Sequence, residues 1–153
     1  MSAELITKFY EAFSRRDAEG MVALYADDVV FSDPVFKDLR GVEAKNMWRM
    51  LCERGRDLKV TFRDVTDTTA HWDADYTFTA TKKFVHNSID AHFVFREGKI
   101  VQHTVVFDLY KWSSQALGLP GKLLGWSSFM QNTIRGKGRA GLAAWSKEHP
   151  DAR

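Results

Sequence analysis

The chain has a single cysteine and only three prolines among 153 residues. One cysteine, Cys52, excludes an internal disulfide framework and is expected to be inert packing. No run of about 18 apolar residues indicates a membrane-spanning helix, and no signal-peptide pattern is present. The formal net charge of +2 is too small to indicate nucleic-acid binding. We therefore expect a soluble, cytoplasmic protein without a nucleic-acid partner.

Patterns that would hold a metal or a phosphate are also missing. The histidines at positions 71, 86, 92, 103 and 149 show no His-x-His or Cys/His ligand spacing. Gly136, Gly138 and Gly141 lie in a basic, helix-like stretch rather than after a strand, so they do not form a phosphate-binding loop. We expect neither a metal nor a cofactor.

The apolar and aromatic contents are 44% and 13%, enough for one sizeable core. Charge is distributed unevenly along the chain. Residues 1–110 carry 15 basic and 18 acidic side chains, whereas residues 111–153 carry 7 basic and 2 acidic ones. The C-terminal tail is therefore the basic part of the protein.

Apolar residues recur at helical spacing over the first 54 residues. Ser2 and Asp17 are placed to cap the first two predicted helices, and a third runs from Val42 to Arg54 with Gly55 as its stop. The residues predicted to face inward are Leu5, Ile6, Phe9, Phe13, Met21, Leu24, Tyr25, Val42, Met47, Met50 and Leu51.

From residue 60 the apolar period changes to two, which is typical of strands. Glu97-Gly98 predicts a tight hairpin turn into a last strand from Lys99 to Tyr110. The alternating apolar positions before it are Val60, Phe62, Val65, Trp72, Ala74, Tyr76, Phe78, Ala80, Ile89, Ala91, Phe93 and Phe95. This order predicts an α+β fold with helices on one face of an antiparallel sheet.

Two segments resemble known families. The run YADDVVFSDPV at Tyr25–Val35 is similar to the base-bearing turn of the ketosteroid isomerases. The run GKIVQHTVVFDLY at Gly98–Tyr110 is similar to the last strand of limonene epoxide hydrolase and of the SnoaL-like polyketide cyclases. All belong to the nuclear transport factor 2-like superfamily.

This resemblance covers about residues 3–118. It implies a cone-shaped domain over residues 1–118, in which three N-terminal helices and a curved sheet enclose a deep apolar pocket for a small hydrophobic ligand. It also implies a homodimer through the outer sheet face. Residues 119–153 would then be a basic helical extension packed on the same domain.

The resemblance places Asp33 at the position of the isomerase base and His103 beside it in the pocket. Burial would raise the pKa of Asp33 toward the range useful for proton transfer. The expected pocket walls are Phe9, Trp48, Phe62, Tyr76, Phe93, Val105 and Phe107. A structural reading stays open for both groups, because an Asp before Pro often starts a turn and a lone strand histidine is often core packing. Asp108 faces away from His103, which favours a structural role.

The oxyanion donors of the isomerases are missing. Phe9 and Ala91 stand at the two donor positions, and Asp90 faces the other side of its strand. Val105 occupies the position of the catalytic carboxylate of limonene epoxide hydrolase. Residues 73–77, which correspond to the Arg/Asp pair of that enzyme, contain no arginine. We therefore expect neither steroid isomerisation nor limonene epoxide opening.

Two kinds of function remain. The first is cofactor-independent proton transfer on a steroid-, polyketide- or terpenoid-like molecule, of isomerase, cyclase or hydrolase type, with Asp33 as base. The alternative is noncatalytic binding or carriage of such a molecule. A protein-interaction module would instead need an exposed apolar patch.

In the tail, Pro120 is expected to begin a helix with a basic end. Its apolar stripe of Leu123, Trp126, Met130 and Ile134 is expected to be buried against the domain or a dimer partner. Contact of this helix with a membrane surface is the less favoured alternative.

Overall fold

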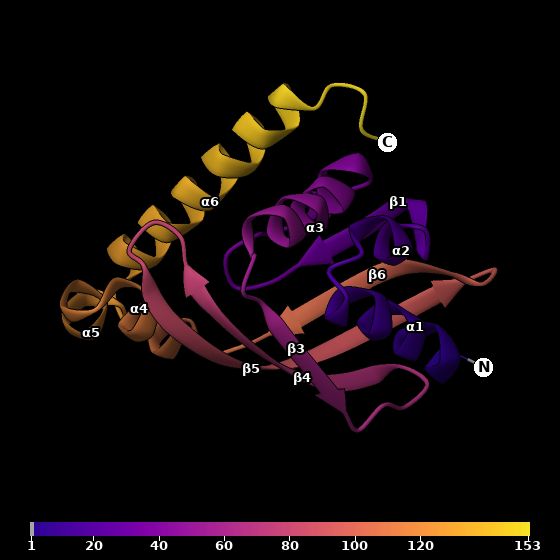
Figure 1. Ribbon diagram of the computed structural model, residues 1–153, viewed down its shortest axis with the longest axis horizontal. Helices are drawn as coiled ribbons and strands as arrows, with labels where there is room; N and C mark the ends of the chain where they lie inside the picture. The colour runs from indigo at the N-terminus through magenta and orange to yellow at the C-terminus, as the bar shows by residue number, and fades with distance from the viewer. Residues whose placement is uncertain (1) are drawn as a thin grey trace.

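The computed structural model describes residues 2–153 as six helices and six strands (Figure 1). The N-terminal elements are α1 (Ser2–Ser14), α2 (Ala18–Val22), β1 (Tyr25–Ser32), β2 (Leu39–Arg40) and α3 (Val42–Arg54). The central strands are β3 (Lys59–Arg63), β4 (Thr69–Phe78), β5 (Lys83–Arg96) and β6 (Lys99–Val106). The tail holds α4 (Leu109–Leu117), α5 (Leu119–Leu124) and α6 (Ser128–Glu148). None of the helices within residues 2–153 is long and apolar enough to cross a membrane.

The strands form one sheet in the order β2-β1-β6-β5-β4-β3. The sheet curls without closing, and α1 and α3 pack against it (Figure 1). Every strand pair is antiparallel, as expected, except β1 and β6, which run parallel with Phe31 opposite His103. The sheet is therefore mixed. Its parallel pair joins Tyr25–Ser32 to a strand that lies about 70 residues later in the chain.

Several residues that cap helices or form turns have the expected geometry. The side chain of Asp17 caps α2 by accepting from the amide of Gly20 at 3.0 Å. Glu97 and Gly98 both adopt positive φ, at 51° and 76°, in the tight turn between β5 and β6. Asp108 caps α4 by accepting from the amide of Lys111 at 3.0 Å, which confirms its structural role. The last strand accordingly ends at Val106 instead of continuing to Tyr110.

Buried apolar side chains form two clusters. The larger one, centred on aromatic rings such as Phe9 and Trp48, lies between the sheet, α1 and α3 and includes Leu142 and Trp145 of α6. The smaller one joins Val85 of β5 to the tail and contains Leu109, Trp112, Ala116 and Ile134. The tail thus contributes to both clusters.

Leu123 and Trp126 are exposed, so the domain itself does not bury the predicted stripe at these two positions, and burial against a dimer partner stays a prediction. Gly125–Ser127 separates α5 from α6, and of the four predicted stripe residues Ile134 is buried and Met130 half-buried. The physical reason is that α5 packs on α4 through its glycines, so its leucines face outward.

Candidate functional site

Asp33 directly follows β1 and holds a tight turn together. Its Oδ1 accepts hydrogen bonds from the amides of Val35 at 2.7 Å and Phe36 at 2.6 Å. Its own amide donates to the carbonyl of Phe36 at 2.7 Å. Asp33 therefore stabilises a turn, which is the structural role that the sequence left open for it. Within the described residues all hydrogen bonds to the carboxylate go to Oδ1, which leaves Oδ2 available to a ligand.

The surroundings of Asp33 disfavour its charged form. Burial raises the pKa of Asp33 to about 6, although the amides of Phe36 and Val35 and the charge of Lys37 act in the opposite direction. A carboxylate with such a pKa exchanges protons readily near neutral pH. This property is the one expected of a proton acceptor in a low-dielectric site.

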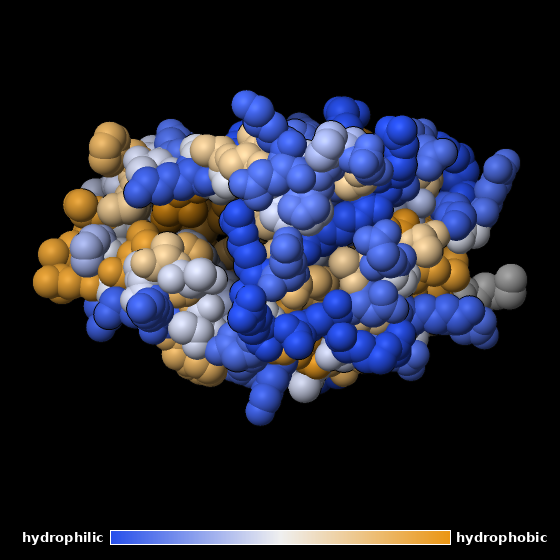
Figure 2. Space-filling model, turned by 45° about the horizontal axis from the view of Figure 1, so that its top comes forward, coloured by the Kyte–Doolittle hydropathy of each residue, from blue (hydrophilic) through white to orange (hydrophobic). Residues whose placement is uncertain are grey.

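Three partly buried side chains lie where the two clusters meet, and two of them, Val35 and Tyr76, interact with Asp33. Val35, Tyr76 and Phe107 pack against both clusters, yet each remains half-buried. The charge of Asp33 is one of the causes that raise the pKa of Tyr76, so the two side chains are close enough to interact. We call Asp33, Val35, Tyr76, Phe107 and Trp112 the junction site. Figure 2 shows a hollow with a hydrophobic floor in the half of the molecule that holds α4 and α5.

Tyr76 is a hydrogen-bond donor without a described acceptor in the junction site. The indole Nε1 of Trp112 donates to its hydroxyl oxygen at 2.6 Å, so the hydroxyl proton is free for another partner. Burial is the largest cause of the raised pKa of Tyr76, and the hydroxyl therefore stays protonated near neutral pH. The sequence predicts Tyr76 only as a pocket wall and does not identify Trp112, whose one available signal is its apolar position in the helix after Asp108.

Helix α6 holds the turn that carries Asp33. The guanidinium Nε of Arg135 donates to the carbonyl of Pro34 at 2.9 Å, and Nη2 of Arg139 donates to the carbonyl of Lys37. Gly138, between these arginines, lies against the side chain of Val35. The tail therefore fixes the position of the carboxylate.

His103 is fully buried among aromatic rings of the larger cluster. Its Nδ1 is 2.7 Å from the hydroxyl of Tyr25, which accepts from Nε1 of Trp48 at 2.7 Å. Because an indole only donates, the Tyr25 proton is available to Nδ1, and we assign the remaining ring proton of His103 to Nε2, which has no hydrogen-bond partner within the described residues. Burial lowers the pKa of His103 to about 3, so the ring is neutral.

The structure does not bring Asp33 and His103 together. No hydrogen bond joins them within residues 2–153, and aromatic rings surround His103, with Phe93 stacked on it at 4.2 Å between ring centroids. Four predicted wall residues, Phe9, Trp48, Phe93 and Val105, are buried in the same cluster. Phe62 stacks on Tyr10 at 5.6 Å. Tyr76 and Phe107 are the predicted wall residues that share the junction site with Asp33.

The side-chain directions on β5 agree with the missing oxyanion donors. Ala91 is fully buried, whereas Asp90 is exposed and accepts a hydrogen bond from Nδ1 of His71 over 2.9 Å on the outer face. Phe9, at the other donor position, is buried beside His103 with a 5.2 Å ring contact.

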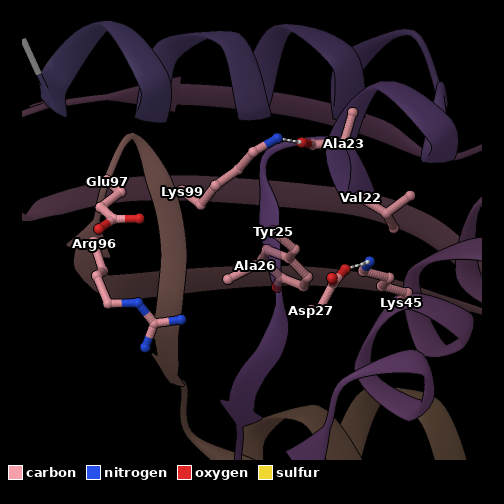
Figure 3. Close-up of a pocket in the computed structure, with 9 residues that line it drawn as sticks. All are labelled: Val22, Ala23, Tyr25, Ala26, Asp27, Lys45, Arg96, Glu97 and Lys99. Atoms are coloured by element: carbon pink, nitrogen blue, oxygen red, sulfur yellow. Dashed lines mark hydrogen bonds and ion pairs between the residues drawn. The ribbon is translucent and has the colours of Figure 1, made fainter.

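A second hollow lies at the opposite end of β1 from Asp33 and has a volume of about 330 Å³ (Figure 3). Three of its charged groups already have partners, since Lys45 lies 3.5 Å from Asp27 and Lys99 donates to the carbonyl of Ala23 at 2.6 Å. A third hollow, of about 400 Å³, separates α3 from α6 next to Leu142. Neither contains an unpaired titratable group with a raised pKa. Within the described part of the chain no three His, Cys, Asp or Glu side chains are grouped to hold a metal ion.

Comparison with known families and structures gives one consistent result. The model of the family described as SnoaL-like domain matches residues 6–103. A candidate polyketide cyclase from a Silicibacter species is 20% identical with a TM-score of 0.61, over 74% of this chain and 93% of that one. No curated protein matches.

Two further similar structures contain small molecules. A protein of ketosteroid isomerase-like fold from Catenulispora acidiphila, in complex with trimethylamine, is 16% identical with a TM-score of 0.62, over 81% of this chain and 97% of that one. The protein TerC, co-crystallised with polyporic acid, is 17% identical with a TM-score of 0.58, over 70% of this chain and 90% of that one. At these identities the similarity establishes the fold.

Proposed function

The chain belongs to the SnoaL-like domain family, within the nuclear transport factor 2-like superfamily, and on that premise we propose that its junction site binds a small apolar molecule with a carbonyl group and that Asp33 exchanges a proton with it. The observation that carries the proposal is the half-buried carboxylate of Asp33, with a pKa of about 6 and an unbonded Oδ2.

The geometry supports a two-group mechanism. Oδ2 of Asp33 accepts a proton from the carbon next to the carbonyl group, and negative charge develops on the carbonyl oxygen. The hydroxyl of Tyr76 donates a hydrogen bond to that oxygen. Asp33 then returns the proton to the same or another carbon of the ligand. No cofactor takes part in these steps.

Tyr76 supplies one of the two donors that Phe9 and Ala91 do not provide. A single donor predicts slower turnover than a complete donor pair, since one such donor contributes about 10²–10³ in rate. The polyporic acid bound to TerC supports an organic ligand of moderate size in this fold. The apolar residues Val35 and Phe107 favour a steroid-, polyketide- or terpenoid-like skeleton over a sugar or nucleotide.

The test uses decalone, a small apolar ketone, in deuterated water. Wild-type protein is expected to speed the exchange of hydrogen for deuterium beside the carbonyl group, measured by NMR. Asp33→Asn should abolish the exchange but retain binding, because its amide oxygen can still accept from Val35 and Phe36. Asp38→Asn, which alters an exposed carboxylate five residues later, is the matched control and should keep full exchange.

Noncatalytic binding or carriage is the second candidate. The burial of His103 favours this candidate, because His103 then does not assist Asp33 as a second acid–base group. Asp33 is left as the one group of the junction site whose pKa is strongly shifted to near neutrality. Saturable decalone binding without exchange by the wild type would support the carrier. Absence of binding by apolar ketones, phenols and aromatic acids would contradict both candidates. Assembly as a homodimer through the outer sheet face stays a prediction.

A further inference from the structure

The end of the molecule formed by α5 and the start of α6 exposes large apolar side chains. Leu123 is 62% exposed, Trp126 69% and Phe129 78%. The indole Nε1 of Trp126 donates to the carbonyl of Leu123 at 2.9 Å, which holds the ring beside α5. We call Leu119, Leu123, Leu124, Trp126 and Phe129 the apolar end. Hydrophobic colour gathers on the left of Figure 2, where Figure 1 places α5.

Close packing of glycines turns these leucines outward. A Cβ on Gly121 would collide with the backbone carbonyl of Ser113 in α4, and one on Gly125 would collide with the hydroxyl of Ser113. The hydroxyl of Tyr110 also donates to the carbonyl of Lys122 at 2.9 Å, which ties α5 to α4. An amphipathic helix usually buries its leucines, but α5 buries its glycine face instead. The leucines cannot turn inward while this contact persists.

The apolar end lies in a segment that has one sign of charge. Between Asp108 and Glu148 the chain contains no acidic residue and six basic ones, Lys111, Lys122, Arg135, Lys137, Arg139 and Lys147. The side chain of Lys83, the first residue of β5, also lies against Gly118 at the start of α5. Lys122 of α5 and Lys83 thus lie next to the exposed apolar side chains, and this combination is complementary to a surface that is anionic outside and apolar beneath.

We propose that the apolar end docks on the surface of an anionic lipid bilayer. Trp126 and Phe129 enter the boundary between headgroups and acyl chains, and Lys122 lies among the anionic headgroups. A second copy of the chain is the poorer occupant, because a two-fold contact through this surface would bring identical basic segments together. The inference goes beyond the proposed function and does not depend on it.

The test is sedimentation of the full chain with lipid vesicles. Vesicles of phosphatidylcholine with about 30 mol% phosphatidylglycerol should bind the protein at low salt, and binding should weaken as salt rises to about 0.5 M. Vesicles of phosphatidylcholine alone should bind it at least about fivefold less, since each basic residue near an anionic surface contributes about that factor. Absence of binding to anionic vesicles at low salt, or equal binding to both kinds, overturns the proposal.

Matched variants locate the contact. Trp126→Ser combined with Phe129→Ser should weaken binding by at least about tenfold, whereas Val94→Ser, at a half-exposed valine of β5, should not change it. Lys122→Glu should weaken binding, and Lys8→Glu, at an exposed position of α1, should weaken it much less. Circular dichroism checks that each variant is folded. If the double variant instead abolishes dimerisation in analytical ultracentrifugation and leaves vesicle binding intact, the apolar end is a protein interface and the proposal is wrong.

Discussion

The indole of Trp112 donates to the hydroxyl oxygen of Tyr76 over 2.6 Å, and this bond joins the tail to the strand that faces Asp33. Its direction matters chemically. An indole cannot accept, so the Tyr76 oxygen is occupied as an acceptor while its proton remains free to point at a ligand. The tail thereby contributes to the site through a residue that does not itself need to touch the reacting atoms.

We predict that Tyr76→Phe lowers proton exchange with decalone by about 10²–10³-fold, because it removes the donor to the developing oxyanion. The binding constant for the ketone should change much less. Exchange rates and binding are measured by NMR, with Tyr110→Phe as the control because its hydroxyl bonds a backbone carbonyl outside the junction site. An unchanged exchange rate in Tyr76→Phe would remove this residue from the mechanism.

We predict that Asp33 makes the folded state less stable as pH rises. Its pKa is about 6 in the folded protein and 3.8 in the reference state, so between these values the folded chain binds the extra proton. The stability associated with protonated Asp33 is therefore present below about pH 3.8 and lost as pH rises through about 6, by about 1–3 kcal/mol. Asp33→Asn should lack this loss and be more stable than the wild type at neutral pH, measured by urea unfolding.

His103 should act in the opposite direction. Its pKa falls from 6.5 to about 3 on folding, so the unfolded chain binds the extra proton in that range. Stability is present above about pH 6.5 and lost as pH falls toward 3. In the wild type the two contributions oppose each other between about pH 4 and 6. Asp33→Asn should therefore expose a steeper loss of stability on acidification in this window, and NMR should show no titration of the His103 ring between about pH 5 and 8.

The sequence predicts the local elements of this fold better than its long-range contacts. The Asp17 cap of α2, the Glu97-Gly98 turn and the alternation along β4 and β5 depend on neighbouring residues, and each has the expected form. Ser2, predicted to cap the first helix, is instead the first residue of α1. The parallel pairing of β1 with β6 depends on a partner far along the chain, and no local pattern reveals it. The outward leucines of α5 follow from a glycine contact with Ser113, which hydrophobic periodicity does not encode.

The residues of the candidate site show the same limit of prediction from sequence. The resemblance places His103 on the inner face, where it is buried, but it cannot say whether that position opens into a pocket or is filled by rings from Phe93, Trp48 and Phe9. Asp33 is identified by its turn sequence, and burial gives it the pKa shift expected of a pocket carboxylate. Trp112 is missed because its partner, Tyr76, lies 36 residues away.

The Trp48–Tyr25–His103 chain should be important for stability. Tyr25→Phe leaves the buried Nε1 of Trp48 and Nδ1 of His103 without partners, and each unsatisfied group costs about 1–3 kcal/mol. We expect a loss of about 2–5 kcal/mol in the free energy of unfolding from urea denaturation. The exposed control Tyr110→Phe should lose less than about 1.5 kcal/mol. A Tyr25→Phe protein as stable as the wild type would contradict the hydrogen-bonded chain.

Two glycines of α6 test whether this helix fixes the Asp33 turn. A Cβ on Gly136 meets nothing within 4 Å, so Gly136→Ala should stabilise the protein by about 0.5–1 kcal/mol through helix propensity alone. A Cβ on Gly138 would lie 2.9 Å from Cγ1 of Val35, and this stiff side chain must shift to make room. Gly138→Ala has the same propensity gain but should be less stable than Gly136→Ala and should alter decalone exchange, because Val35 donates its amide to Asp33. Equal stability and equal exchange in the two variants would show that α6 does not control the position of the carboxylate.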